Sequence, residues 1–249
     1  MALMTKKSRR PGRTAKGEPR QTRGDRVEGV YAQLRELILN GRMAPGSRIL
    51  ETDIAERFGV SRTPVRSALQ RLRQEGFIVS ADHTSQARLW VAPLSRADAR
   101  ELLAILGLCE ALAAGWAAEL PGEEREAVVR RLRELNGRFH ERGATGKPDS
   151  DELFGIDREL HATFFDAGAG PRLKSLHESV KPQVERYLAL YMKALVDRLE
   201  DSVHEHEAVI AAIERGDPEA ARSMVAANWA AAAQRLDGVM ERLGERGIW

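Results

Sequence analysis

Three side chains in the second half of the chain have residue types and spacing suited to holding a divalent metal ion. Asp157 and His161 stand four positions apart, so on a helix they share one face and can chelate one ion. His206 belongs to a different predicted helix and can approach the same ion from across a bundle. Each of these side chains, taken alone, is also compatible with an ordinary hydrogen-bonded or exposed position. We assign that ordinary role to the remaining candidates His140, His177 and His204.

A second group of side chains with a possible function lies at the start of a helix predicted over residues 61–75. Arg62, Thr63 and Arg66 fall on the face opposite the apolar positions, close to the helix N-terminus. An arginine side chain can hydrogen-bond O6 and N7 of guanine together. The hydroxyls of Ser61 and Thr63, with the positive end of the helix, suit backbone phosphates. This pattern indicates contact with double-stranded DNA, although a solvated face on a short helix has a similar polarity.

The elements that must position those arginines occupy residues 27–93. Apolar residues at helical spacing predict a first helix from Val27 and a short second helix around 52–58, which Gly59 ends. Ser61 is expected to cap the third helix. Two β-prone segments then flank a polar stretch and predict a hairpin over 77–91. This order of elements is the layout of a winged helix-turn-helix domain, whose second motif helix lies in the major groove.

The remaining residues, 94–249, have a helical pattern throughout, so the fold class is mainly α. Turn signals separate predicted helices at about 95–119, 123–142, 151–166, 172–196, 198–215 and 218–243. Pro182 should kink or split the fourth of these helices. We expect an antiparallel bundle of six or seven helices whose core side chains can line a cavity.

Composition and charge exclude several classes of protein. The 249 residues are 43% hydrophobic and 31% charged, which fits a folded chain. A single cysteine, no apolar run of membrane-spanning length and no secretory signal predict a cytoplasmic protein without a membrane partner. Residues 1–26 hold nine Lys or Arg, two acidic residues and few apolar ones, so we expect a disordered basic arm. The second half of the chain is acidic. A basic N-terminal part followed by an acidic part favours a polyanion-binding domain joined to a domain with another function.

The first domain also carries a recognisable series of motifs. They are Leu34-Arg-Glu-Leu-Ile38, Gly41, Pro45-Gly46, Leu50-Glu51, Ile54-Ala55 and, above all, Gly59-Val-Ser-Arg-Thr-Pro-Val-Arg66 with Ala68-Leu69 and Leu72. This series resembles the GntR family of bacterial transcription regulators. The resemblance implies that Arg62 and Arg66 contact DNA and that the wing tip, 82–85, enters the minor groove. This chain departs from the family at Thr52, where some members have a contacting arginine, and at His83, where glycine is frequent.

The second domain has its own motifs. They are Glu101-Leu-Leu, Asp157-x-x-x-His161 followed by Phe164-Phe165, then Leu173, and Glu205-His206-x-x-x-Ile210-x-x-Ile213-x-x-Gly216-Asp217. These resemble FCD, the helical ligand-binding and dimerisation domain of the FadR subfamily. The resemblance implies a divalent ion of the zinc, nickel or manganese class. Its fourth ligand is a histidine in the family but Asn228 here, a weaker and harder ligand. The alternative is an Asp–His–Asn polar cluster that binds the effector directly.

The resemblance also implies a small-molecule effector, usually an organic acid. Many members carry an effector-binding arginine where this chain has Leu106. Arg186, Tyr187 and Asn228 are the remaining candidates for effector contact, although Arg186 and Tyr187 could equally serve packing and surface charge. We therefore expect a carboxylate metabolite as effector.

These expectations combine into a homodimeric, ligand-responsive transcription regulator, most often a repressor in this family, that binds an imperfect palindrome. One rival is a metal-dependent enzyme of the bundle fused to a DNA-binding head. We expect no enzyme, because no general base can be paired with the candidate ligands. A purely architectural DNA-binding protein is the other rival, but it would leave the large helical domain without a task.

Overall fold

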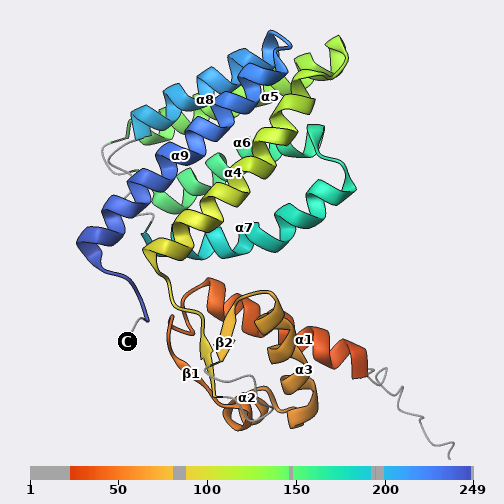
Figure 1. Cartoon of the computed structure of the whole chain (residues 1–249), viewed down its shortest axis with the longest axis vertical. Coiled ribbons are helices and arrows are strands. Elements are labelled where there is room, and N and C mark those ends of the chain that lie inside the picture. The colour runs from red at the N-terminus through yellow and green to blue at the C-terminus, as the bar shows by residue number, and fades with distance from the viewer. Residues whose placement is uncertain (1–22, 81–87, 146–147, 192–193, 195–198, 248–249) are drawn as a thin grey trace, which may run out of the picture.

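The described part of the first domain folds into three helices and a three-stranded sheet, at the bottom of Figure 1. The computed structural model describes residues 23–80, 88–145, 148–191, 194 and 199–247. The helices are α1 (Arg23–Leu39), α2 (Glu51–Phe58) and α3 (Arg62–Gln74). The strands are β1 (Arg48–Ile49), β2 (Ile78–Ser80) and β3 (Leu89–Val91), ordered β1-β3-β2 with antiparallel pairings. The predicted winged helix-turn-helix fold is thereby confirmed.

The turn between α2 and α3 directs the helix that carries the arginines. Gly59 adopts φ of 64°, a left-handed conformation that favours glycine, and it closes α2 as predicted. Ser61 is the N-cap residue of α3, but its side chain makes no capping hydrogen bond. The inner face of α3 is fully buried in the domain core through Val65, Ala68, Leu69 and Leu72. The opposite face therefore points away from the protein.

The second domain is the antiparallel helical bundle in the upper part of Figure 1. Its helices within the described residues are α4 (Arg96–Ala118), α5 (Gly122–Gly143), α6 (Ser150–Gly168), α7 (Pro171–Tyr191), α8 (Leu199–Glu214) and α9 (Pro218–Leu243). The predicted caps are present: the Ser95 side chain accepts from the Asp98 N–H, and Asp217 caps α9 ahead of Pro218. Six described helices agree with the predicted bundle.

Three details differ from the sequence-based expectations. Helix α1 begins at Arg23, so residues 23–26 are helical rather than part of a disordered arm, while residues 1–22 lie outside the described residues. Helix α7 is not split, because it continues across Pro182 with buried residues on both sides of the proline. Strand β1 was not predicted, since two residues are too short to form a sequence pattern, yet it pairs with β3.

Close helix contacts in the bundle bring α4 against α6 and α9. A Cβ atom at Gly168 would lie 2.0 Å from the backbone oxygen of Ala113, so only glycine permits this approach of α6 to α4. Gly107 of α4 likewise lies directly under Trp229 of α9. These contacts place the inner faces of α4, α6 and α9 within hydrogen-bonding reach of one another.

Although we expected no membrane-spanning run from the sequence, helix α4 is long and apolar enough to cross a membrane by length and composition alone. However, 61% of its most apolar 18-residue window is buried inside the fold, as in the core helix of a bundle. Its apolar character is therefore accounted for largely by packing.

Candidate functional site

Asp157 and His161 of α6 meet His206 of α8 beside a pocket in the bundle. The Nε2 atom of His206 lies 3.2 Å from Oδ1 of Asp157, and one potential ligand atom from each of the three residues lies within 4.8 Å of the other two. In the described part of the chain, this is the one group of three or more histidine, cysteine or acidic side chains close enough to share an ion. The four-residue spacing and the second helix have therefore brought together the residues expected from the sequence.

Hydrogen bonds on the far side of each imidazole set the orientation of both rings. Nδ1 of His161 lies 2.7 Å from Oε2 of Glu110, and Nδ1 of His206 lies 3.2 Å from Oδ1 of Asn136. Donation from Nδ1 leaves Nε2 of each ring with a free lone pair. His206 is only 1% exposed, yet its Nε2 makes no hydrogen bond of acceptable geometry. A buried nitrogen without a partner costs free energy that a bound cation would offset, so these residues fit a divalent ion.

Glu110 of α4 is a buried charged residue beside this site that our sequence analysis did not single out. Its side chain is 1% exposed, and its two oxygens accept from His161, from Nε2 of His177 at 2.8 Å and from Nε1 of Trp229 at 2.8 Å. The available signal was its position as the single charged residue between Glu101 and Glu119 in an apolar helix. His177, expected to be an ordinary hydrogen-bonded histidine, is one.

The electrostatics of this cluster favour charged carboxylates next to imidazoles. Burial alone would raise the pKa of Glu110, but the charges and hydrogen bonds of His161 and His177 lower it to about 2. Burial likewise opposes charge on His161, yet Glu110 and Asp157 raise its pKa above the ordinary value. For Asp157, burial raises the pKa, but the adjacent imidazoles of His206 and His161 lower it overall. The carboxylates of Glu110 and Asp157 therefore carry negative charge, which can stabilise either a protonated imidazole or a bound cation.

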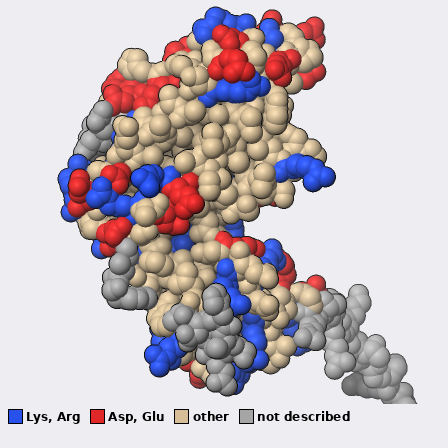
Figure 2. All heavy atoms as spheres, viewed as in Figure 1, with Lys and Arg blue, Asp and Glu red and all other residues tan. Residues whose placement is uncertain are grey.

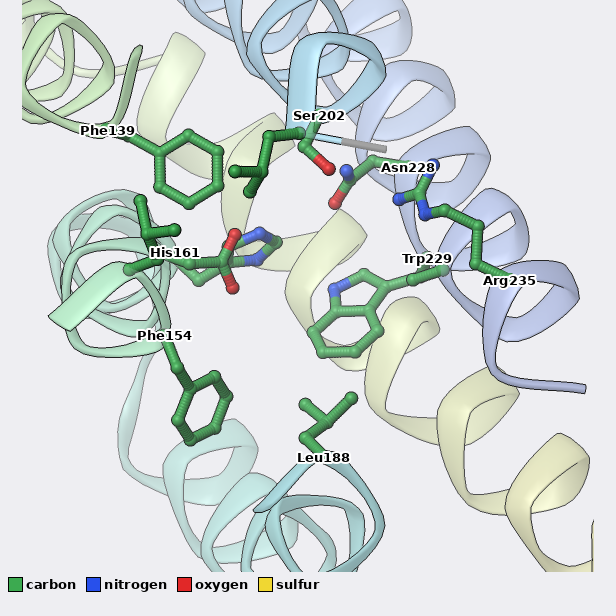
Figure 3. A pocket seen from close by; sticks show the side chains of 12 residues that line it. Phe139, Phe154, His161, Leu188, Ser202, Asn228, Trp229 and Arg235 are labelled. Atoms are coloured by element: carbon green, nitrogen blue, oxygen red, sulfur yellow. The ribbon is translucent and has the colours of Figure 1, made fainter. Parts of the chain in front are cut away.

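The pocket beside these residues has a volume of about 710 Å³, including space open to solvent. Figure 3 shows His161, Asn228 and Trp229 facing one cavity, with Phe139, Phe154 and Leu188 forming apolar walls. The other lining residues are Leu153, Asp157, Leu199, Ser202, Ala232 and Arg235. A mostly apolar cavity with a few convergent polar groups is suited to a small-molecule ligand.

Asn228, the residue at the position of the expected fourth ligand, lies in this pocket. Its Nδ2 donates to Oε2 of Glu205 at 2.8 Å, which turns its oxygen toward the side of His161 (Figure 3). Glu205 also forms a two-point ion pair with Arg235 at 2.7 and 2.9 Å. The amide oxygen of Asn228 therefore faces the cavity as an acceptor, while Arg235 is neutralised by a neighbouring carboxylate.

Arg186 and Tyr187, expected to contact an effector, do not line this pocket. Arg186 is buried at the junction with the first domain, where Nη2 donates to the backbone oxygen of Ala92 at 2.7 Å. The hydroxyl of Tyr187 donates to Asp98 at 2.5 Å and accepts from the Ser95 N–H at 3.1 Å. Arg186 therefore bonds to the first domain and Tyr187 to the start of α4, so effector contact by these two residues stays a prediction that this pocket does not support.

The expected DNA-contacting arginines are exposed on α3. The side chains of Arg62 and Arg66 are 61% and 64% exposed, and both approach Glu51, with N–O distances of 3.6 and 3.1 Å. Thr52 lies at the neighbouring start of α2, where its hydroxyl donates to Asp53. Both side chains are exposed, and Arg66 makes hydrogen bonds to both carboxylate oxygens of Glu51. Thr63 lies beside Arg62 in the first turn of α3, whereas His83 lies outside the described residues.

Comparisons with known proteins agree with this geometry. The family model described as "Bacterial regulatory proteins, gntR family" matches residues 26–85, and the FCD domain model matches residues 97–231. The chain is 27% identical to the HTH-type transcriptional regulator YdhC of Bacillus subtilis over 85% of this chain and 91% of that protein. It is 26% identical to a D-xylose utilization operon transcriptional repressor of Paenarthrobacter nicotinovorans, over 77% and 82% of the two chains.

A solved structure gives the same fold. A GntR-type transcriptional regulator of Rhodococcus sp. RHA1 superposes with a TM-score of 0.63 at 21% identity, over 86% of this chain and 98% of that one. A winged helix-turn-helix domain joined to a helical domain with a pocket is the architecture of a class of transcription regulators rather than of enzymes. The chain belongs to the GntR family of bacterial regulatory proteins and carries an FCD domain.

Proposed function

We propose that the protein is a homodimeric transcriptional repressor whose operator binding is relieved by a small organic acid, bound through a divalent ion in the FCD domain. The observation that carries this proposal is the unpartnered, buried Nε2 of His206 beside Asp157, next to a cavity. Two histidines and one carboxylate form a ligand set that leaves positions open for an effector. Repression is supported by the name of the Paenarthrobacter relative.

The charges around the pocket favour a metal-assisted carboxylate over direct binding. Arg235 is the one arginine or lysine among the residues that line the pocket, and Glu205 already neutralises it. A carboxylate that enters would also meet the negative charge of Asp157. A bound divalent ion reverses that local charge and supplies positions for carboxylate oxygens. The amide oxygen of Asn228 can complete the coordination or accept a hydrogen bond from the effector.

Metal analysis of the purified full chain tests the proposal. We expect about one zinc, nickel or manganese ion per chain, and none in Asp157→Ala. His204→Ala is the matched control, because His204 lies on α8 near His206 but is exposed and bonded to a backbone oxygen. A metal-free parent chain that still binds carboxylates would instead support a direct polar pocket of Asp157, His161 and Asn228.

The DNA-binding part of the proposal is that Arg62 and Arg66 read bases while Ser61, Thr63 and Thr52 contact phosphates. Arg66→Ala is expected to weaken operator binding by about 1 to 3 kcal/mol and to relax the preference at one base pair. Arg130→Ala on the remote helix α5 is the control, since its side chain is equally exposed. Equal weakening on operator and random DNA would mean that Arg66 contacts only the backbone.

The dimer is supported by an apolar stripe on the outer face of α4. Ile105, Leu108, Leu112 and Trp116 share one helix face and are between 39% and 65% exposed. Figure 2 shows a broad surface without charged side chains over α4, whereas charges gather at the upper end of the bundle. Large exposed apolar patches mark interaction sites. A second copy here would place two DNA-binding heads on two half-sites, as a palindrome requires.

Sedimentation analysis tests this dimer surface. Leu108→Glu should convert the dimer to a monomer, because it places a charge in the centre of the stripe. Leu176→Glu is the control, since Leu176 is similarly exposed but lies on α7. If Leu108→Glu still forms a dimer, the dimer interface lies on another surface of the protein.

We also propose that this regulator acts in the cytoplasm, where its operator DNA is found.

A further inference from the structure

One buried carboxylate orients a proposed metal ligand without touching the ion itself. We propose that Glu110 is a positioning residue of the metal site, which holds His161 with Nε2 facing the ion. This inference rests on the proposed metal binding. It goes beyond that function by assigning part of the ion affinity to a residue on α4, a helix that contributes none of the candidate ligands.

The carboxylate of Glu110 accepts three hydrogen bonds from side chains of three other helices. Oε2 accepts from Nδ1 of His161 at 2.7 Å and from Nε1 of Trp229 at 2.8 Å, and Oε1 accepts from Nε2 of His177 at 2.8 Å. These three donors come from α6, α9 and α7. A carboxylate in the middle of an apolar helix is costly to bury, and an apolar residue of similar volume would often serve stability as well. Its presence therefore indicates a task other than packing.

The task follows from which nitrogen of His161 the carboxylate holds. An acceptor on Nδ1 fixes the proton there and leaves Nε2 unprotonated, facing Asp157 and His206. A carboxylate behind an imidazole ligand also raises the basicity of the coordinating nitrogen. Asn136 holds Nδ1 of His206 in the same way, but with a neutral oxygen at 3.2 Å. His161 is accordingly the more strongly oriented of the two rings.

His177 provides a matched comparison on the same carboxylate. It bonds to the other oxygen of Glu110, is also buried, and stacks on Phe165 with ring centroids 3.8 Å apart. It is not part of the ion-binding group. Removing His177 should therefore disturb the packing around Glu110 but leave the orientation of His161 intact.

Zinc titration of the full chain against a competing chelator tests the inference. Glu110→Gln is nearly isosteric and should weaken zinc binding by about 10- to 100-fold. His177→Gln should keep an affinity close to that of the parent chain, even where its unfolding midpoint falls. Asp157→Ala should bind no zinc. Equal losses in Glu110→Gln and His177→Gln would mean that Glu110 acts only through general stability, which overturns the inference.

A second measurement needs no variant and so does not depend on how Glu110→Gln folds. In nitrogen NMR spectra of the zinc-loaded parent chain, His161 should coordinate through Nε2 and carry a slowly exchanging proton on Nδ1. Coordination through Nδ1, or an Nδ1 without a proton, would overturn the inference. A parent chain that takes up no zinc would overturn both the metal-assisted function and this inference. Zinc binding that is lost in Asp157→Ala but unchanged in Glu110→Gln would overturn this inference alone.

Discussion

Two polar clusters with buried members are linked to helix α7 and differ in one respect. The ion cluster consists of Glu110, Asp157, His161 and His206, to which α7 contributes the hydrogen bond of His177. The junction cluster consists of Asp98, Gln183, Arg186 and Tyr187, where α7 meets the first domain. At the junction the polar groups find partners within the protein: Arg186 donates to Ala92 and Gln183, and Gln183 donates to the backbone oxygen of Glu75. In the ion cluster, Nε2 of His206 lies 3.2 Å from Oδ1 of Asp157 but makes no hydrogen bond of acceptable geometry.

This difference shows what separates a binding site from a structural contact in a helical bundle. Both clusters contain charged residues that are removed from water, so buried charge alone does not identify function. The junction cluster borders the DNA-binding domain, and none of its buried side-chain nitrogen or oxygen atoms lacks a hydrogen bond. The ion cluster borders a pocket of about 710 Å³, a volume that includes space open to solvent, and one of its buried nitrogens makes no hydrogen bond. An unmatched buried atom next to a cavity is the feature that points to an external ligand.

The largest expected effect is the loss of metal-dependent stability in His206→Ala. Zinc at 100 times its dissociation constant should stabilise the parent chain by about 2.7 kcal/mol. For a chain of this size, that gain raises the melting temperature by about 5 to 10 °C relative to chelator-treated protein. His206→Ala should show no such difference, and His204→Ala should retain it, as measured by thermal melting with and without chelator. A zinc-dependent shift that persists in His206→Ala would remove the distinction between the clusters.

Arg186→Met tests the junction cluster in the opposite sense. The substitution keeps most of the apolar stem but removes a charge-assisted hydrogen bond to a buried backbone oxygen, so we expect a loss of about 2 to 3 kcal/mol in the free energy of unfolding. Zinc affinity should remain that of the parent chain. Urea denaturation and chelator titration measure the two quantities separately. Weaker zinc binding in Arg186→Met would show that the clusters are not independent.

The sequence predicted the local parts of this comparison and missed the long-range parts. The spacing of Asp157 and His161 is a helical period, and it predicted a shared face without any knowledge of the fold. Glu110, Asn136 and the pair of Glu205 with Arg235 depend on which helices pack together, which no local pattern records. The same limit explains why the buried contact of Arg186 with Ala92 was not predicted, because its residue type suggested a ligand contact while its helix face was set by packing.

The architecture was easier to predict than the site. Glycines and prolines mark the turns between helices, so the order of elements from α1 to α9 follows from the sequence, apart from β1 and the uninterrupted α7. Of the kink or split expected at Pro182, the split did not occur, and residues on both sides of the proline pack into the core. A proline in a pattern predicts a lost hydrogen bond but does not reveal whether tertiary contacts offset that loss.

A pH titration of zinc affinity sharpens the comparison further. Burial lowers the pKa of His161, but Glu110 and Asp157 raise it above 6.5 overall. Below that raised pKa, zinc must displace a proton, so affinity should fall by up to about tenfold per pH unit as the solution is acidified. In the metal-free chain, the raised pKa of His161 adds to the free energy of unfolding below pH 6.5. This contribution is lost as the pH rises through the pKa of His161 in the folded chain. Arg186→Met should give the parental pH profile of zinc affinity, and a changed profile would contradict a separate junction.

The smallest expected effect concerns the link between the clusters through α7. Gln183→Ala removes the hydrogen bond to the backbone oxygen of Glu75, at the end of α3, and should cost about 1 kcal/mol of stability. Zinc binding should not change, since Gln183 touches neither the pocket nor a candidate ligand. If α7 transmits occupancy of the pocket to the DNA-binding domain, the operator affinities of loaded and metal-free chains should differ less in Gln183→Ala than in the parent. Coupling is a difference in affinity between two states. An undiminished difference in a DNA-binding titration would place the transmission in the Ala92–Ser95 linker instead.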